Sequence, residues 1–122
     1  MPVGLAVALA GGVGAFARYL LDFYAGDQLE PHHQVYVTLF VNLAGSMLLG
    51  VLIGAHPDGR WRIILGVGFL ASFTTFSTLV SQVYHAMDGG SYATGLALPT
   101  VSLVAGVVVL WIGVAGGHHV AR

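Results

Sequence analysis

Long stretches without a single formal charge are the feature that most constrains how this chain folds. No Asp, Glu, Lys or Arg occurs in four stretches, which are residues 1–17, 31–57, 63–87 and 89–121. A helix that crosses a membrane needs about 20 mostly apolar residues. We therefore expect an all-α membrane protein with four transmembrane helices, over about residues 3–24, 35–55, 61–87 and 92–115.

The composition excludes an ordinary soluble domain. Apolar residues make up 57% of the 122 residues and charged residues only 7%, whereas soluble domains carry roughly 25% charged residues. The net charge of −1 provides no basic face for nucleic acid. The absence of cysteine excludes disulfides and thiolate metal sites. We expect one four-helix transmembrane domain over residues 1–122.

Turn residues in short connections make consecutive spans antiparallel. Glycine, proline and aspartate gather at residues 26–31, 56–60 and 88–91, and each favours a turn. Four spans place both termini on one side, together with three of the four arginines, Arg60, Arg62 and Arg122. The positive-inside rule therefore favours cytoplasmic termini.

The third predicted span carries an unusual run of hydroxyls. Residues 72–78 read Ser-Phe-Thr-Thr-Phe-Ser-Thr. One interpretation is a continuous helix whose hydroxyls bond back to the preceding turn. The sharper interpretation is a helix broken at mid-membrane that lines a polar path. On a helix, Thr74, Ser77, Ser81 and Tyr84 would form one stripe.

Asn42 and Arg18 are further polar groups within apolar spans. Asn42 is either an interhelical hydrogen bond that holds the bundle together or a donor that faces an ion path. Arg18 lies four residues before Asp22. It is either part of an interfacial ion pair or an anchor at the mouth of an anion pathway. In the fourth span, Ser102 offers one more hydroxyl to a pore.

The histidines and the acids do not form a pattern typical of an enzyme. His118 and His119 are adjacent, but a pair without further ligands is a weak indication of a metal site. Ser81 and His85 are four residues apart, and no Asp or Glu in their span orients a base. We therefore expect a protein that is not an enzyme.

Three motifs carry a resemblance to a known family. Residues 11–19, Gly-Gly-Val-Gly-Ala-Phe-Ala-Arg-Tyr, resemble the GGxxGxxxRY/W opening of the Fluc (CrcB) fluoride channels at Gly11, Gly14, Arg18 and Tyr19. Asn42-Leu43-Ala44-Gly45-Ser46 followed by Gly50 resembles their NxxG…G motif. Gly68-Phe69 followed by residues 74–78 resembles their GF…TTFSTF signature. The resemblance covers nearly the whole chain.

The resemblance implies a passive, fluoride-selective export channel that reduces fluoride toxicity, in a bacterial inner (plasma) membrane. It implies an antiparallel, dual-topology-type dimer with pores at the subunit interface. It implies a structural sodium ion, not transported, on the backbone carbonyls of Ala71 and Thr74. The pore-lining residues that it implies are Asn42, Phe76, Thr75, Ser77, Thr78 and Ser102. Amide and hydroxyl donors and aromatic ring edges are groups that can replace the water around fluoride.

Two departures from the family pattern bear on assembly. Leu79 stands where the family usually has a second pore phenylalanine, and Ala71-Ser72 stands where it usually has Gly-Gly. A partner chain with both phenylalanines would supply an intact pore. Together with the arginine bias, this favours a heterodimer with a similar subunit of opposite orientation over a homodimer. Alternatives to the fluoride channel are a small four-helix proton-coupled drug exporter and a non-conducting structural membrane subunit.

Overall fold

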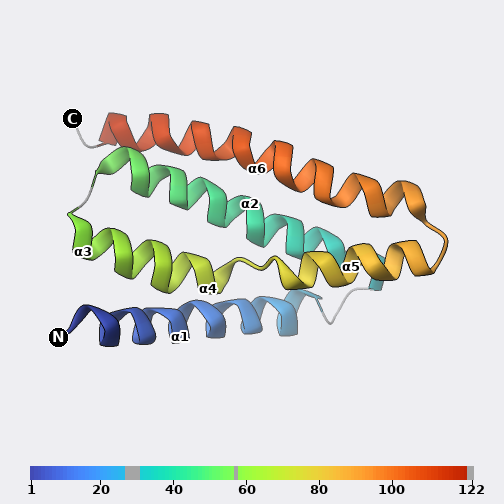
Figure 1. Cartoon of the computed structure of the whole chain (residues 1–122), viewed down its shortest axis with the longest axis horizontal. Helices are drawn as coiled ribbons and strands as arrows, with labels where there is room; N and C mark the ends of the chain where they lie inside the picture. The colour runs from blue at the N-terminus through green and yellow to red at the C-terminus, as the bar shows by residue number, and fades with distance from the viewer. Residues whose placement is uncertain (27–30, 57, 121–122) are drawn as a thin grey trace.

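The computed structural model describes residues 1–26, 31–56 and 58–120 (Figure 1). All of its regular elements in these ranges are helical. In chain order they are α1 (Val3–Leu21), the π-helical η1 (Asp22–Gly26), α2 (Pro31–Ala55), α3 (Gly59–Arg62), the π-helical η2 (Ile63–Leu70), α4 (Ala71–Phe73), α5 (Ser77–Asp88) and α6 (Tyr92–Val120).

These elements combine into four long apolar helical segments, each of a length suited to crossing a membrane. They are Val3–Tyr24, Val35–Ala55, Gly59–Asp88 and Tyr92–Val120. The prediction of an all-α chain with four such segments is therefore confirmed. The last segment continues beyond the predicted end at residue 115. Its two final turns include Gly117, which packs on α2, and such packing outweighs the low helix propensity of glycine.

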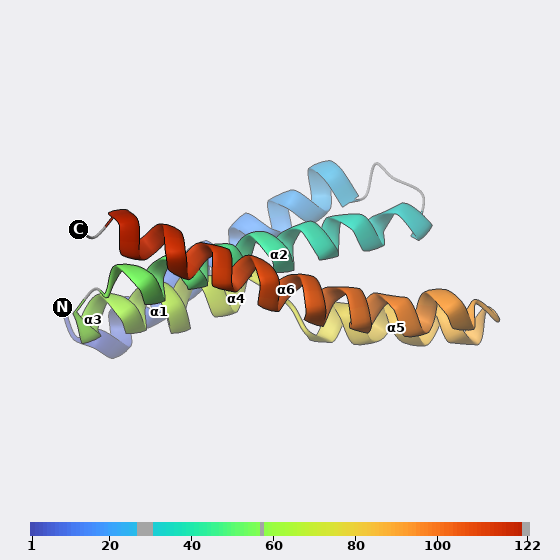
Figure 2. The same cartoon turned by 90° about the horizontal axis from the view of Figure 1, so that it is seen from above.

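The four segments lie side by side as long rods, and the described chain begins and ends at the same side of the bundle (Figure 1). α2 and α6 run in the same direction and share the most extensive contact. Seen from above, the end of α1 and the start of α2 diverge from α5 and from the start of α6 (Figure 2). The bundle is therefore closed at one end and splayed at the other.

Glycines let α2 and α6 approach to backbone contact. A Cβ added at Gly50 would collide with the Leu110 carbonyl, and one added at Gly113 would collide with the Met47 carbonyl. Gly54 and Gly117 stand in the same relation one turn further along. In lipid, where apolar burial does not drive helices together, small residues of this kind permit close van der Waals packing.

The third segment is interrupted at residues 74–76. α4 ends at Phe73, Thr74 is extended with φ −80° and ψ 163°, and α5 begins at Ser77. The Thr74 hydroxyl donates to the Leu70 carbonyl at 3.0 Å, so Thr74 closes the helix before the interruption. The expected single-helix stripe through Thr74, Ser77, Ser81 and Tyr84 is therefore wrong, because Thr74 does not belong to α5.

Candidate functional site

A groove of about 590 Å³ opens beside the interruption. Its walls come from α2, from η2, α4 and the start of α5, and from α6. The lining residues are Asn42, Gly45, Ser46, Leu49, Gly66, Leu70, Ala71, Thr74, Thr75, Phe76, Leu79, Pro99, Ser102 and Leu103. None of these side chains is charged, and a small number of polar groups converge on a mostly apolar surface, as is typical of ligand sites.

The groove gathers many of the predicted site residues from distant parts of the chain. Asn42, Thr75, Phe76 and Ser102 line it, and so do both residues of the predicted sodium site. Thr78 and Arg18 lie beside it in the polar network described below rather than on its wall. Ser77 begins α5, but its side chain lies outside the part of the chain that the structure describes.

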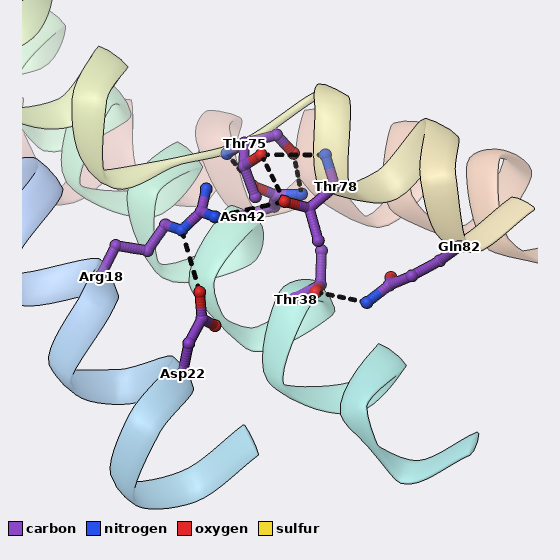
Figure 3. Close-up of polar contacts among 7 residues, drawn as sticks. All are labelled: Arg18, Asp22, Thr38, Asn42, Thr75, Thr78 and Gln82. Carbon is purple, nitrogen blue, oxygen red and sulfur yellow. Dashed lines mark hydrogen bonds and ion pairs between the residues drawn. The ribbon is translucent and has the colours of Figure 1, made fainter. Parts of the chain in front are cut away.

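Asn42 holds the interruption through two reciprocal hydrogen bonds (Figure 3). Its Nδ2 donates to the Thr75 carbonyl at 3.0 Å, and its Oδ1 accepts from the Thr75 N–H at 2.8 Å. The side-chain amide thus pairs with both backbone groups of Thr75, in a segment that has left the helix. Asn42 thus bonds from α2 to the interruption and also lines the groove.

A chain of polar contacts continues from Thr75 to the first helix (Figure 3). The Thr75 hydroxyl accepts from the Thr78 N–H at 3.1 Å and donates to the Thr78 Oγ1 at 3.1 Å. Thr78 Oγ1 also accepts from Arg18 Nη2 at 3.2 Å. Arg18 Nε lies 3.4 Å from Asp22 Oδ2. Arg18 therefore ties α1 to the start of α5 and is also paired with an acid.

Phe76 and Leu79 both line the groove. Phe76 is the residue directly before α5, and its side chain is 79% exposed on the surface of the chain. An aromatic ring this exposed on a single chain is available to an ion in the groove, to lipid or to a second subunit. Leu79 lies on the groove wall where a ring would stand in the family pattern.

Ser102 contributes a hydroxyl whose hydrogen bonding is incomplete. Its Oγ is buried and has no hydrogen-bond partner among the described residues. A buried polar atom without a partner is uncommon and costs free energy. The hydroxyl of Ser102 is therefore placed to bond a guest in the groove that it lines.

Gln82 and Thr38 form a further polar contact that the sequence analysis did not identify. Gln82 Nε2 donates to the buried Thr38 Oγ1 at 2.8 Å (Figure 3), and Gln82 Oε1 is buried without a partner in the described part of the chain. Gln82 stands out as an amide in an apolar span. Thr38 gives no signal of its own, because single threonines are common in such helices.

The interruption takes the helical donors away from the carbonyls of Ala71 and Thr74. In a continuous α-helix the N–H of residue i donates to the carbonyl of residue i−4. The Thr75 N–H goes instead to Asn42, and the Thr78 N–H goes to the Thr75 hydroxyl. The carbonyls of Ala71 and Thr74 thereby lose their helical donors. These are the two residues of the predicted sodium site, and carbonyl oxygens suit a hard cation.

Comparison with known proteins identifies the family. Residues 5–114 match the family described as CrcB-like protein, Camphor Resistance (CrcB). The chain belongs to the CrcB family.

Curated relatives of this CrcB-family chain are named as fluoride-specific ion channels. FluC of Bordetella petrii is 36% identical over 119 residues, covering 93% of this chain and 90% of the relative. FluC 1 of Geobacillus kaustophilus is 36% identical over 118 residues, covering 97% of each chain. FluC 2 of Symbiobacterium thermophilum is 37% identical over 112 residues, covering 88% of this chain and 90% of the relative.

Family membership and the four apolar segments together make this CrcB chain a multi-pass membrane protein. The relatives' names describe channels and not enzymes, in agreement with the expectation from the sequence. The polar contacts around Thr75 therefore lie in a segment that crosses the membrane.

Proposed function

We propose that this chain is a subunit of a fluoride-selective channel that exports fluoride passively and so reduces its toxicity. The observation that carries the proposal is a groove of uncharged hydrogen-bond donors beside an interrupted helix, in a chain whose curated relatives are named as fluoride-specific channels. The expected location is the plasma membrane of a bacterium.

Fluoride entering the groove exchanges water for protein donors. Asn42 has two amide N–H bonds, and the bond to Thr75 uses one of them. Ser102 brings a hydroxyl without a protein partner among the described residues, and Phe76 brings the positive edge of its ring. Thr75 and Thr78 contribute indirectly, because their hydroxyls hold the backbone at the interruption. Ser77 is the remaining hydroxyl that we assign to the pore.

The absence of charge on the groove wall favours conduction over tight binding. A full positive charge would hold the anion and slow its exit. Arg18 stands next to the groove but is paired with Asp22 and bonded to Thr78. We assign it the role of an anchor at the pore vestibule. No carboxylate lines the groove, so a proton-coupled cation exporter is not favoured.

We also propose that the functional unit is an antiparallel dimer, with the interruption of the third segment at mid-membrane and the pores at the subunit interface. The exposed Phe76 ring beside an open groove supports a second subunit that covers both. A heterodimer is favoured, because Leu79 lacks a ring. The arginines Arg60 and Arg62 lie at one end of the bundle and favour one orientation; Arg122 lies outside the described residues.

A structural sodium ion, which is not transported, completes this proposal. The carbonyls of Ala71 and Thr74 would hold it, since their helical donors are diverted to Asn42 and Thr75. Backbone carbonyls ligate a monovalent cation without adding charge to the site. Two subunits would supply four such oxygens on the dimer axis. The bound ion would satisfy carbonyls that the interruption leaves within the membrane.

The proposal is tested by fluoride efflux from liposomes that contain the assembled protein, with and without a co-expressed similar subunit. Phe76→Ile keeps apolar bulk and removes the ring edge. We expect it to reduce efflux strongly. Phe16→Ile is the matched control, because Phe16 is also exposed, at 60%, but lies outside the groove. Equal efflux for the two variants would contradict the role of Phe76, and no fluoride efflux from any preparation would contradict the channel.

A further inference from the structure

Two histidines from distant parts of the sequence lie in contact where α2 and α6 end. His56 directly follows the last residue of α2, and His118 lies in the last turn of α6. Their ring centroids are 5.0 Å apart with an interplanar angle of 49°. Both residues are exposed; His56 lies just beyond the apolar segment Val35–Ala55, and His118 lies two residues before the end of the segment Tyr92–Val120. The pair is therefore accessible to ions in water.

The glycine contacts between α2 and α6 bring the two rings together. A Cβ added at Gly54 would lie 2.9 Å from the His118 backbone nitrogen, so the helices touch directly beneath the pair. His56 itself has a left-handed backbone, with φ 52°. Glycine or asparagine would adopt this conformation at least as readily. The turn alone therefore does not require an imidazole at this position.

We propose that His56 and His118 bind one divalent transition-metal ion of the zinc class between their rings. Each nitrogen lies about 2.0–2.1 Å from zinc in protein sites, and a tetrahedral angle between two such ligands places the ring centres about 5 Å apart. The observed separation of 5.0 Å meets that requirement. The centroid separation thus equals that of two ligands of one ion, and it is also the separation of a tilted ring contact.

The ends of α2 and α6 favour a bound cation, whereas Arg60 and Arg62 at the same end of the bundle oppose one. α2 and α6 both terminate here, and helix C-termini carry a partial negative charge that stabilises cations. The neighbouring Arg60 of α3 is bonded to the carbonyl of Met1. Among the described residues, no group of three or more His, Cys, Asp or Glu side chains gathers to hold a metal. Water would therefore complete the coordination, and the ion would join the ends of two helices.

Zinc titration of the tag-free, full-length protein in detergent tests the proposal, with calorimetry and the thermal midpoint as readouts. We expect one zinc ion per chain and a rise in the midpoint, because a ligand that binds the folded state stabilises it. His118→Gln and His56→Asn should each weaken zinc binding by about tenfold or more, since even outer-shell partners of a metal ligand contribute 10–100-fold to affinity. Asparagine at position 56 tolerates the left-handed backbone, so the turn is kept.

His119→Gln is the matched control, because it removes a neighbouring imidazole on the same turn of α6 and should leave zinc binding unchanged. Three results would overturn the proposal. They are the absence of zinc binding, binding that persists at full strength in both pair variants, and an equal loss in His119→Gln. The thermal midpoint of each variant without zinc shows whether the fold itself has changed.

Discussion

At the scale of single residues, one asparagine determines how the third segment leaves its helix. Asn42 pairs with the N–H and the carbonyl of Thr75, two groups that an interrupted helix would leave without partners in an apolar setting. An unpaired backbone group costs about 2–7 kcal/mol on transfer to an apolar medium such as lipid. The amide of Asn42 therefore makes the interruption possible, in addition to lining the groove.

We expect Asn42→Ala to lower the free energy of unfolding by about 1–3 kcal/mol, because it leaves the backbone of Thr75 unpaired. Equilibrium unfolding in mixed detergent micelles measures the change. Thr100→Ala serves as the control. Thr100 is exposed and donates only to the Leu96 carbonyl of its own helix, at 2.8 Å, so its loss should change stability little. Equal effects of the two substitutions would show that the contact with Thr75 is not a stabilising one.

At the scale of helices, α2 and α6 form the most closely packed pair of the described chain. Their glycines meet the backbone of the opposite helix at Gly50, Gly54, Gly113 and Gly117. α1 packs against η2 and α4, which form the part of the third segment that precedes the interruption. The groove lies between these two units because residues 74–76 have left the helix, with Thr74 extended, and supply no helical surface to fill it.

We expect Gly113→Ala to destabilise the protein by about 1–3 kcal/mol, the usual cost of overpacking a close contact. A Cβ at this position would collide with the Met47 carbonyl, which is backbone and has little freedom to move. Gly116→Ala, on the same helix, has no atom within 4 Å of its added Cβ and should be neutral or slightly stabilising, since alanine favours a helix. Thermal unfolding in detergent compares the two. A smaller loss for Gly113→Ala than for Gly116→Ala would refute the close-contact account.

The interruption also gives a prediction about sodium. Replacing sodium by N-methylglucamine, which is too large for a carbonyl site, should lower the thermal midpoint of the assembled protein. Asn42→Ala should reduce this sodium dependence, because it releases the Thr75 N–H that Asn42 now diverts from Ala71. A midpoint that is the same in both salts would count against a structural ion at Ala71 and Thr74.

At the scale of the whole molecule, the chain presents an apolar exterior. Large side chains such as Leu103, Trp111 and Tyr24 are 70%, 68% and 69% exposed. In water such a surface would drive aggregation, but in a bilayer it faces lipid or another subunit. Arg60 and Arg62, at the start of α3, mark one end of the bundle, and we expect this end to stay in the cytoplasm.

Expression of the chain alone, with a topology reporter at its C-terminus, tests this orientation and the proposed heterodimer. We expect mostly cytoplasmic C-termini and little fluoride efflux from the purified chain by itself. Co-expression with a similar subunit of opposite orientation should restore efflux. Both ideas fail together if the chain inserts equally in both orientations and conducts fluoride alone.

The sequence by itself determined the four helical segments and the family. An apolar run long enough to cross a bilayer is expected to be a helix, because every backbone group in lipid must be paired within the protein. The hydroxyl run at residues 72–78 likewise marked the third segment as unusual. The motifs also contain four of the five polar residues that line the groove, Asn42, Ser46, Thr74 and Thr75.

Only the tertiary structure decided which groups meet. Periodicity describes neighbours along one helix, so it placed Thr74 on a stripe with α5, whereas the chain is extended at Thr74. Asn42 and Thr75 are 33 residues apart, Arg18 and Thr78 are 60 apart, and His56 meets His118 across two helix ends. Such pairs depend on how closely the helices pack, and that closeness is set by glycines whose partners lie on another helix.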